Sequence, residues 1–492
     1  MKFSFLLKDF TEREIDPGKL AVIGNEKQLT WKEFEQEVHD FCTFFKSRSW
    51  DKLQFPVILY GHKEVEMIVA VYALMKMEVP YIPADIVYPK DRIASIGKIA
   101  QSHLVVNCTK HALELENVTE VLYSLGEMNE LHTAEMALTP EKPSDPLVYL
   151  IFTSGSTGEP KGVQISTEAI QDFTNWMTSD FGFSSHDTFI NIALLSFDLS
   201  VYELMTFGAL GATLLLNDKQ TTEDPALLMK RVEQYHGTVW VSTPSFSFMY
   251  SRLDDTHQLD SLRYFLFCGE LLPHPLAKAL VQKFPQAVVY NTYGPTEATV
   301  ATTRVVIDQD MLDKHNPLPV GYSKPRSRIV IDNDEIVIVG KNVSLGYLNR
   351  PDLNEAKFIT IDSERAFKTG DNGYLENGML FFKGRNDDQV KLHGYRIELN
   401  EITSKMNDID FILQAETIAL KRNEEVKKIV SLVRIKANQA QELDWRKEIS
   451  AILAETLPPY MIPSDIKILD NIPLNQNGKA DKKALEAIYL GR

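Results

Sequence analysis

The first strongly patterned stretch of the chain predicts an amphipathic helix that begins near Trp31. Thr30 and Glu33 have the spacing of a capping box, in which each side chain accepts a hydrogen bond from the other residue's backbone. Apolar residues then recur every three or four positions, as they do along one face of a helix. We expect this face to pack in the core through Phe34, Val38, Phe41, Cys42 and Phe45.

Short apolar runs alternate with further helical patterns over most of the chain that follows. We expect strands within residues 56–60, 103–107, 149–152, 238–245, 264–270 and 287–290, and helices within residues 64–77 and 167–177 and near Arg92. This alternation predicts an α/β fold, in which mostly parallel sheets are covered by helices.

The pattern changes near residue 320 into short strands separated by turns, as at residues 329–331 and 335–339. These strands predict a small β-rich subdomain. Beyond it, helices and strands alternate again out to Arg492. We expect a large domain over residues 1–386, which includes the β subdomain, and a small α+β domain over residues 387–492.

A dense polar loop follows the apolar run at residues 149–152. Its hydroxyls, its glycine backbone and one lysine could cradle a phosphate, although a plain surface loop has a similar composition. The loop is not a Walker A motif, because Pro160 precedes the lysine and a glycine follows it. The residues concerned are Thr153, Ser154, Gly155, Ser156, Thr157, Gly158, Lys161 and Gly162.

Three more polar loops follow expected strands, near Asp198, Cys268 and Gly294. Ligands of open α/β sheets bind beyond the carboxyl ends of the strands. The four loops could therefore converge on one site.

Composition narrows the class of protein. A chain of 492 residues exceeds one ordinary core, and its net charge of -16 argues against a nucleic-acid or anionic-membrane binder. Three distant cysteines predict neither a disulfide framework nor a metal site, so we expect a cytoplasmic protein. The apolar run at residues 3–7 is too short for a signal peptide or a membrane span.

Five motifs in order resemble the adenylate-forming superfamily of acyl and aminoacyl ligases. They are residues 153–162, residues 291–297, Thr369-Gly370-Asp371, Gly384-Arg385 and Asn477-Gly478-Lys479. Within the superfamily, residues 196–201, 242–246, 265–270, 291–300 and 391–396 look most like the stand-alone ligases that load D-alanine onto a carrier protein for teichoic acid modification.

The resemblance implies a two-step reaction. A carboxylate attacks the α-phosphate of ATP to give an acyl-adenylate and pyrophosphate, and a phosphopantetheine thiol then displaces AMP. The implied cofactors are ATP and Mg²⁺. The implied partners are an amino acid and a small acyl carrier protein that bears phosphopantetheine, with the enzyme a cytoplasmic monomer.

The resemblance also implies a role for particular residues. Lys479 would be the catalytic residue, bridging the α-phosphate and the substrate carboxylate, Glu297 would hold Mg²⁺, and Asp387 would be the hinge of a mobile small domain. The expected ATP-binding residues are Thr153, Ser154, Gly155, Ser156 and Thr157 for the β- and γ-phosphates, Asn291, Thr292, Tyr293, Gly294, Pro295 and Thr296 for adenine and the α-phosphate, and Asp371, Phe382, Lys383, Gly384 and Arg385 around the ribose.

Asp198 carries most of what the sequence says about the substrate. It stands among apolar residues, where an unpaired carboxylate is costly, and a substrate ammonium would offset that cost. The alternative is an aspartate that caps a helix at Leu199. By the resemblance, Cys268 and Val300 would line a small pocket beside the alanine methyl, although a lone cysteine is more often plain core.

The chain departs from the pattern of these ligases at three places. Tyr202-Glu203 replaces a pair such as Met and Asp, the hairpin within residues 329–339 is short, and polar Asn386 and Asp388 flank the hinge. Three alternatives therefore stay open. They are a peptide-synthetase-type enzyme for another small amino acid, a non-catalytic nucleotide-binding relative, and an acyl–coenzyme A ligase, which Asp198 disfavours.

Overall fold

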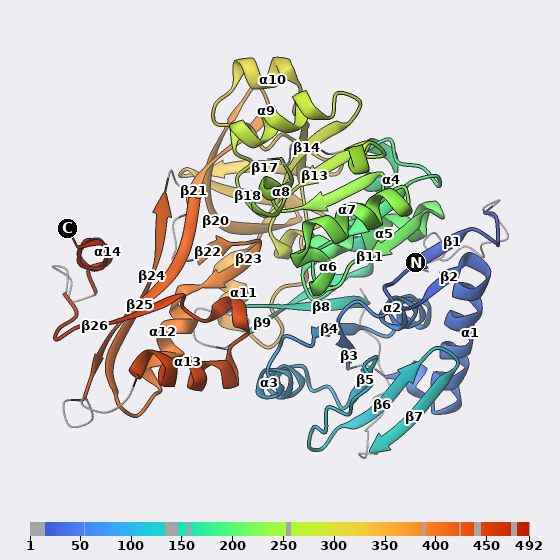
Figure 1. The fold of residues 1–492 in the computed structure, drawn as a ribbon, viewed down its shortest axis with the longest axis horizontal. Helices are drawn as coiled ribbons and strands as arrows, with labels where there is room; N and C mark the ends of the chain where they lie inside the picture. The colour runs from blue at the N-terminus through green and yellow to red at the C-terminus, as the bar shows by residue number, and fades with distance from the viewer. Residues whose placement is uncertain are drawn as a thin grey trace. The chain divides into compact units, whose positions relative to one another are not determined.

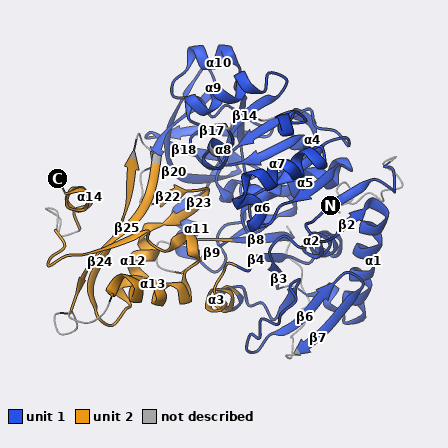
Figure 2. Ribbon diagram, viewed as in Figure 1, with its two compact units in different colours: residues 1–86, 97–151, 162–386 blue, residues 87–96, 152–161, 387–492 orange. Residues whose placement is uncertain are grey.

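The structure is a computed structural model. It describes residues 15–53, 55–132, 146–154, 159–251, 257–385, 389–422, 425–436, 444–473 and 480–491. The chain forms two compact units (Figure 2): unit 1 comprises residues 1–86, 97–151 and 162–386, and unit 2 comprises residues 87–96, 152–161 and 387–492. The division into two domains that we expected from the sequence stays a prediction.

The larger sheet of unit 1 has nine strands in the order β16-β15-β14-β13-β12-β10-β11-β1-β2 (Figure 1). Its six inner strands, from β14 to β1, pair in parallel, whereas β2, β15 and β16 pair antiparallel at the edges. The strands are β1 (Leu20–Ile23), β2 (Gln28–Thr30), β10 (Thr188–Asn191), β11 (Thr213–Leu216), β12 (Val239–Ser242), β13 (Tyr264–Phe267), β14 (Val288–Tyr293), β15 (Thr303–Val306) and β16 (Tyr322–Ser323).

A second sheet has seven strands in the order β7-β6-β5-β3-β4-β8-β9. Strands β6, β5, β3, β4 and β8 are parallel and β7 is antiparallel. The strands are β3 (Val57–Gly61), β4 (Tyr81–Asp85), β5 (Leu104–Asn107), β6 (Thr119–Ser124), β7 (Glu127–His132), β8 (Leu147–Thr153) and β9 (Lys161–Ser166). The two sheets confirm the expected α/β fold with mostly parallel strands.

The helices of unit 1 bury their apolar faces as the sequence predicts. Helix α1 (Trp31–Ser47) begins with the expected capping box, and all five residues of its apolar stripe are buried. Helix α2 (Val65–Met77) is buried nearly all round, which fits its uniformly apolar sequence. The others are α4 (Thr167–Asp180), α5 (Val201–Leu210), α6 (Lys219–Glu223), α7 (Pro225–Gln234), α8 (Pro244–Ser251), α9 (His274–Lys283), α10 (Gln309–Lys314) and α11 (Pro351–Lys357).

The expected β subdomain is an antiparallel sheet of five strands within unit 1. Its short hairpin turns through Asn333 and Asp334, whose φ angles of 50° and 68° suit a tight two-residue turn. The strands are β17 (Ser327–Asp332), β18 (Glu335–Gly340), β19 (Phe358–Ile361), β20 (Glu364–Glu376) and β21 (Met379–Arg385).

Unit 2 has its own apolar core, which includes Ile397, Ile402 and Ile449. Helix α3 (Lys90–Ala100) begins in this unit. Its other elements include the hairpin β22 (Gln389–Leu392) and β23 (Tyr395–Glu398), the strands β24 (Ile412–Arg422), β25 (Glu425–Ile435) and β26 (Asp465–Ile468), and the helices α12 (Leu399–Asn407), α13 (Trp445–Thr456) and α14 (Lys482–Leu490). Among the described residues, no helix is long and apolar enough to cross a membrane.

Candidate active site

The end of β14 directs side chains to both faces of the large sheet. The sequence suggested that the polar loop begins at Asn291, but the strand continues to Tyr293, because β15 pairs with it. Successive strand residues point to opposite faces. The Asn291 amide accordingly donates to the carbonyl of Pro319 (2.7 Å) and Tyr293 bonds Asp371, whereas Thr292 contacts helix α5 on the other face.

Tyr202 of α5 joins several of the expected substrate residues. Its hydroxyl lies 2.7 Å from the hydroxyl of Thr292, which itself donates to the carbonyl of Phe267 (2.8 Å). Burial raises the pKa of Tyr202 well above its usual value, and the nearby Cys268 thiol and Asp198 carboxylate raise it further. Tyr202 therefore lies among the residues expected to hold the amino acid.

Asp198 is partly buried and begins a short 3₁₀ turn, Asp198–Ser200, just before α5. It is not a helix cap: Phe197 and Ser200 occupy the N-cap positions of the turn and of α5, and neither makes a side-chain capping bond. The charge of Asp198 also helps to raise the pKa of the buried Tyr149 hydroxyl, after burial and Tyr81. The Asp198 carboxylate therefore lies near the buried tyrosines of unit 1, and Asp198 is not the N-cap residue of either helix.

Cys268 and Val300, which we expected beside the substrate's side chain, contact each other. The Cys268 thiol lies 3.9 Å from the carbonyl oxygen of Val300, and both residues are buried. Val300 has a φ of 69° and the preceding Thr299 a φ of 53°, a backbone conformation that costs free energy for β-branched residues. Gly294 allows the fold here, because a Cβ at this position would lie 2.4 Å from the Cα of Ala301.

Asp371 lies on the other face of β14 with two donors. Tyr293 donates its hydroxyl to Asp371 Oδ2 (2.7 Å) and Arg385 donates to Oδ1 (2.5 Å). The ring of Phe382 lies 6.1 Å from that of Tyr293. Lys383 is placed differently, since its half-exposed ammonium lies 3.6 Å from Asp334. These contacts bring three of the five expected ribose-side residues together, namely Asp371, Phe382 and Arg385.

Glu297 is fully buried in the turn after β14. Tyr347 donates its hydroxyl to Glu297 Oε1 at 2.6 Å and holds the carboxylate in place. Among the described residues, no group of three or more His, Cys, Asp or Glu side chains could hold a metal ion alone. Glu297 is therefore not part of a metal cage among the described residues.

The first residues of the polar loop after β8 belong to unit 2. The Ser154 hydroxyl donates to the carbonyl of Arg396 and accepts from the backbone N–H of Glu398, both at 3.0 Å. The buried Lys161 ammonium pairs with Glu398 at 3.1 Å. Thr153 donates weakly to the Lys161 carbonyl (3.5 Å). In this unit, Ser154 and Lys161 thus hold β23.

Several expected site residues lie outside the described part of the chain: Gly155, Ser156, Thr157, Asp387 and Lys479. Two residues of the candidate site had no role in the sequence analysis. Tyr202 was noted only as a departure from the family pattern, although its place one helical turn after Asp198 is a usable signal. Tyr347 has no such signal, because it belongs to no motif.

The comparisons with known proteins agree with this geometry. The family described as AMP-binding enzyme matches residues 11–348, and the one described as AMP-binding enzyme C-terminal domain matches residues 403–479. The chain therefore belongs to the AMP-binding enzyme family. This membership indicates an AMP-forming ligase and implies the use of ATP, and it confirms the resemblance to adenylate-forming enzymes.

Two curated relatives match over nearly their whole length. A Bacillus licheniformis protein named D-alanine–D-alanyl carrier protein ligase is 38% identical over 506 residues, which cover 99% of each chain. A protein of the same name from Bacillus cereus (strain B4264) is 36% identical over 489 residues, which cover 95% of this chain and 96% of the relative.

Solved structures share the fold at lower identity. The Vibrio cholerae adenylation domain AlmE, in complex with glycyl-adenosine-5′-phosphate, has a TM-score of 0.81 at 20% identity and covers 99% of this chain and 97% of its own. The o-succinylbenzoate CoA synthetase of Bacillus subtilis has a TM-score of 0.80 at 20% identity and covers 98% of both chains.

Proposed function

We propose that this enzyme activates D-alanine with ATP as an aminoacyl-adenylate and transfers it to the phosphopantetheine thiol of a carrier protein, for D-alanylation of teichoic acid. The observation that carries the proposal is the placing of Tyr202 beside Asp198, Cys268 and Thr292. A carboxylate, a small thiol and a hydroxyl around one ring suit a small amino acid. The curated relatives carry the same activity in their name.

ATP fits the polar groups on the Tyr293 face of β14. The buried Oδ1 of Asn291 accepts no hydrogen bond from any described residue, and the amino group of adenine could supply one. We propose that Asp371, held by Tyr293 and Arg385, accepts from the ribose hydroxyls. Thr153 and Ser154, with Gly155, Ser156 and Thr157, would donate to the outer phosphates, and Gly294, Pro295 and Thr296 would line the α-phosphate.

Mg²⁺ fits Glu297 by the chemistry of its donor. A carboxylate oxygen is a ligand that this hard cation prefers, and Mg²⁺ commonly takes only one or two carboxylates, with nucleotide phosphates and water completing its shell. When bound, the ion would neutralise phosphate charge. Tyr347 would keep the Glu297 carboxylate oriented, through its 2.6 Å hydrogen bond.

The first half-reaction needs no general base, because an amino-acid carboxylate is already ionised at neutral pH. It needs an oriented carboxylate and cations near the phosphate charge that grows in the transition state. We propose that Asp198 fixes the substrate by its ammonium and that Lys479 is the cation at the α-phosphate. The thiol then attacks the adenylate carbonyl, forming a thioester and releasing AMP.

We also propose that the enzyme acts as a cytoplasmic monomer. The cysteines Cys42, Cys108 and Cys268 form no disulfide bond, which suits a reducing compartment.

Amino-acid-dependent exchange of pyrophosphate into ATP tests the substrate. The assay should compare D-alanine with L-alanine, glycine, serine and a fatty acid at matched concentrations. We expect the highest kcat/KM with D-alanine. Equal exchange with glycine or L-alanine would contradict the specific assignment, and exchange with the fatty acid alone would contradict the role of Asp198.

A second candidate is a stand-alone peptide-synthetase-type enzyme for another small amino acid. The pair Tyr202-Glu203 favours it, because this pair departs from the pattern of the D-alanine ligases. Higher exchange with glycine than with D-alanine would decide for this candidate.

The proposed role of Lys479 has its own test. Lys479→Ala should lower the rate of adenylate formation by about a thousandfold, because a cation that stabilises transition-state charge is lost. Transfer from preformed aminoacyl-adenylate to the carrier should change by less than about threefold, since the thiol in that step attacks the acyl carbon and no bond to phosphorus forms. Single-turnover assays of the two steps measure both rates, and equal losses would contradict a role confined to the first step.

A further inference from the structure

Lys63 is a buried lysine that none of the motifs accounts for. It lies between β3 and α2, and its ammonium donates to the side-chain oxygen of Asn191 and to the carbonyl of Ala193. Burial lowers the pKa of Lys63 to about 8, and the nearby carboxylates, which raise the pKa, offset only part of this effect. Removing an ammonium from water is costly, so we expect the buried Lys63 to have a structural or functional role.

Glu203 of α5 completes the cluster from the other side. Its Oε1 accepts from the Asn191 amide at 3.3 Å. Its Oε2 is buried and accepts no hydrogen bond of ordinary length from the residues that the structure describes. Burial raises the pKa of Glu203 to about 8, although Lys63 and Asn191 favour the charged form.

These contacts hold both ends of the segment that carries Asp198. Asn191 is the last residue of β10, Ala193 is in the loop that follows, and Glu203 is in the first turns of α5. Asp198 stands between them. The cluster therefore fixes where the strand ends and where the helix begins relative to α2, which determines where the Asp198 carboxylate can lie.

We propose that Lys63, Asn191 and Glu203 are positioning residues for Asp198, and that their hydrogen bonds set the affinity of the enzyme for the substrate's amino group. The inference rests on the proposed function, because it requires an amino group for Asp198 to bind. Burying a lysine and a carboxylate is costly, whereas the directional hydrogen bonds that Asn191 makes with both side chains favour one arrangement of the chain.

Other charged groups also face Lys63. Asp85, at the end of β4, and Asp218, after β11, both raise its pKa. Asp85 is itself bound to Nδ1 of His62 at 2.8 Å, and His62 Nε2 accepts from the backbone N–H of Lys219 at 3.0 Å. Because Nε2 accepts, Nδ1 carries the proton and His62 is neutral here. Of the three carboxylates that raise the pKa of Lys63, only Glu203 belongs to the segment that carries Asp198.

Lys63→Met tests the positioning role in the exchange assay, with whichever amino acid the wild type uses best. We expect the KM for the amino acid to rise about tenfold, as the loss of a charge-assisted hydrogen bond would predict, while kcat and the KM for ATP change by less than about twofold. The matched control is Thr238→Val, which removes a buried hydrogen bond at the other end of β10. It should leave both KM values unchanged.

Glu203→Gln gives a second readout that a merely structural role would not move. The amide keeps the acceptor for Asn191 but removes the carboxylate that raises the pKa of Lys63. We expect the amino-acid KM of the wild type to show an inflection near pH 8, where Lys63 titrates, and we expect this inflection to move to lower pH in the variant. The titration of the substrate is common to both proteins and cancels in the ratio of their KM values.

The outcomes of these assays test the positioning role separately from the proposed function. A selective rise in the amino-acid KM for Lys63→Met, or a pH-dependent ratio for Glu203→Gln, supports the positioning role. If the wild type activates an amino acid but KM stays unchanged and the ratio is constant from pH 6.5 to 9.5, the positioning role is wrong and the proposed function stands. If no amino acid supports exchange, both are wrong. Should Lys63→Met fail to fold, the Glu203→Gln ratio decides alone.

Discussion

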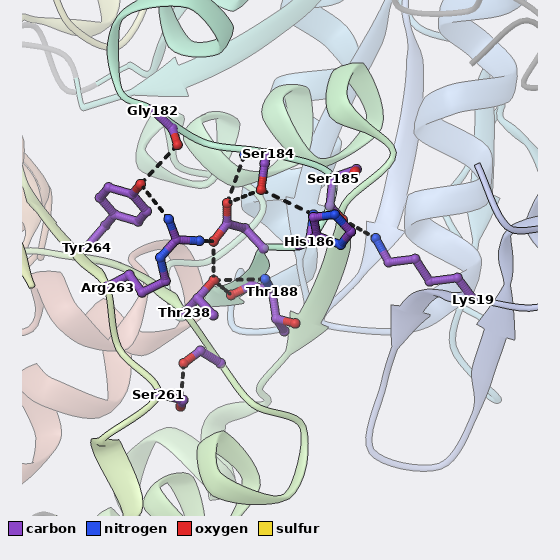
Figure 3. Close-up of polar contacts among 12 residues, drawn as sticks. Lys19, Gly182, Ser184, Ser185, His186, Thr188, Thr238, Ser261, Arg263 and Tyr264 are labelled. Carbon is purple, nitrogen blue, oxygen red and sulfur yellow. Dashed lines mark hydrogen bonds and ion pairs between the residues drawn. The ribbon is translucent and has the colours of Figure 1, made fainter. Parts of the chain in front are cut away.

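The two ends of strand β10 hold buried charged groups that are used in different ways. At the amino end, Asp187 is fully buried, and its two oxygens accept four hydrogen bonds. Oδ2 accepts from the N–H and the hydroxyl of Ser184, and Oδ1 accepts from Thr238 (2.8 Å) and Arg263 (3.1 Å). Figure 3 labels the three donor residues. Lys19 closes the same region by donating to the carbonyl of Ser185 and, at 2.8 Å, to that of Gly211.

The carboxyl end is less completely bonded. Within the described residues, the Oε2 of Glu203 and the Oγ of Ser196 have no hydrogen-bond partner although both are buried, and both follow this end of β10. Unused buried polar atoms are costly unless a ligand or water completes them. The general division of α/β sheets, with structural bonds at the amino end and binding groups at the carboxyl end, is therefore what we propose for this strand.

The largest expected difference between the two ends comes from neutralising one aspartate at each. Asp198→Asn should lower kcat/KM for the amino acid by about a hundredfold, or about 3 kcal/mol, because the substrate ammonium loses its partly buried counter-charge. The KM for ATP should stay the same. Steady-state exchange kinetics with each substrate varied in turn measure both.

Asp187→Asn is the matched control for that prediction. An amide has one acceptor oxygen, so it cannot serve both the Ser184 donors and the pair formed by Thr238 and Arg263. We expect thermal unfolding about 3 °C lower, which is the scale for a loss of about 3 kcal/mol in a chain of this size, with unchanged KM values. An altered amino-acid KM in this variant would break the comparison.

A smaller effect is expected from Tyr202→Phe at the carboxyl end. Because Thr292 gives its proton to the Phe267 carbonyl, Tyr202 must donate to Thr292, and its removal leaves a buried acceptor unpaired. The amino-acid KM should rise about fivefold, with the KM for ATP unchanged, since one neutral hydrogen bond is worth about 1 kcal/mol. If only the melting temperature falls, Tyr202 belongs to the core and not to the pocket.

Local patterns predicted much of this fold and of the site. The capping box of Thr30 and Glu33, the apolar stripe of α1 and the strands before the polar loops all occur as expected. Cys268 lies beside the carbonyl of Val300, and Cys268 and Asp198 both act on the pKa of Tyr202, but the roles expected of these residues stay a prediction. These features depend on neighbours along the chain or on the order of strands, which the sequence displays directly.

Contacts between distant segments could not be predicted in the same way. Strand β14 extends through Tyr293 only because β15 pairs with it, and no local pattern in Asn291–Tyr293 shows that pairing. Tyr347 reaches Glu297 from 50 residues away, and Lys63 reaches Asn191 from 128 residues away. A lysine beside an apolar helix looks like a surface residue until the fold buries it.

The buried groups Lys63 and Glu203 at the carboxyl end should make the stability of the fold depend on pH. The cost of burying Glu203 appears as the pH rises from its ordinary value of 4.5 and is complete above about 8. The cost of burying Lys63 is complete below about 8 and disappears toward 10.5. Together they destabilise the fold most near pH 8.

The double variant Lys63→Met/Glu203→Gln removes both titrations. The melting temperature of the double variant minus that of the wild type should therefore be highest near pH 8 and lower at pH 5 and pH 10, by about 2 °C. Differential scanning fluorimetry across that range measures it. A difference that is flat with pH would mean that the two groups keep their ordinary pKa values in the folded protein.

The smallest effect is expected from Arg263→Gln at the amino end. The Arg263 side chain is 50% exposed, so its pair with Asp187 is screened by solvent, and Thr238 and Ser184 still bond the carboxylate. We expect unfolding about 1 °C lower at low salt, no difference at high salt, and unchanged kinetics, because exposed ion pairs contribute less than about 1 kcal/mol. A change in the amino-acid KM would show that Asp187 influences the Asp198 loop along β10. The two ends of the strand would then act as one unit, and the division between structural and binding groups would not hold for this sheet.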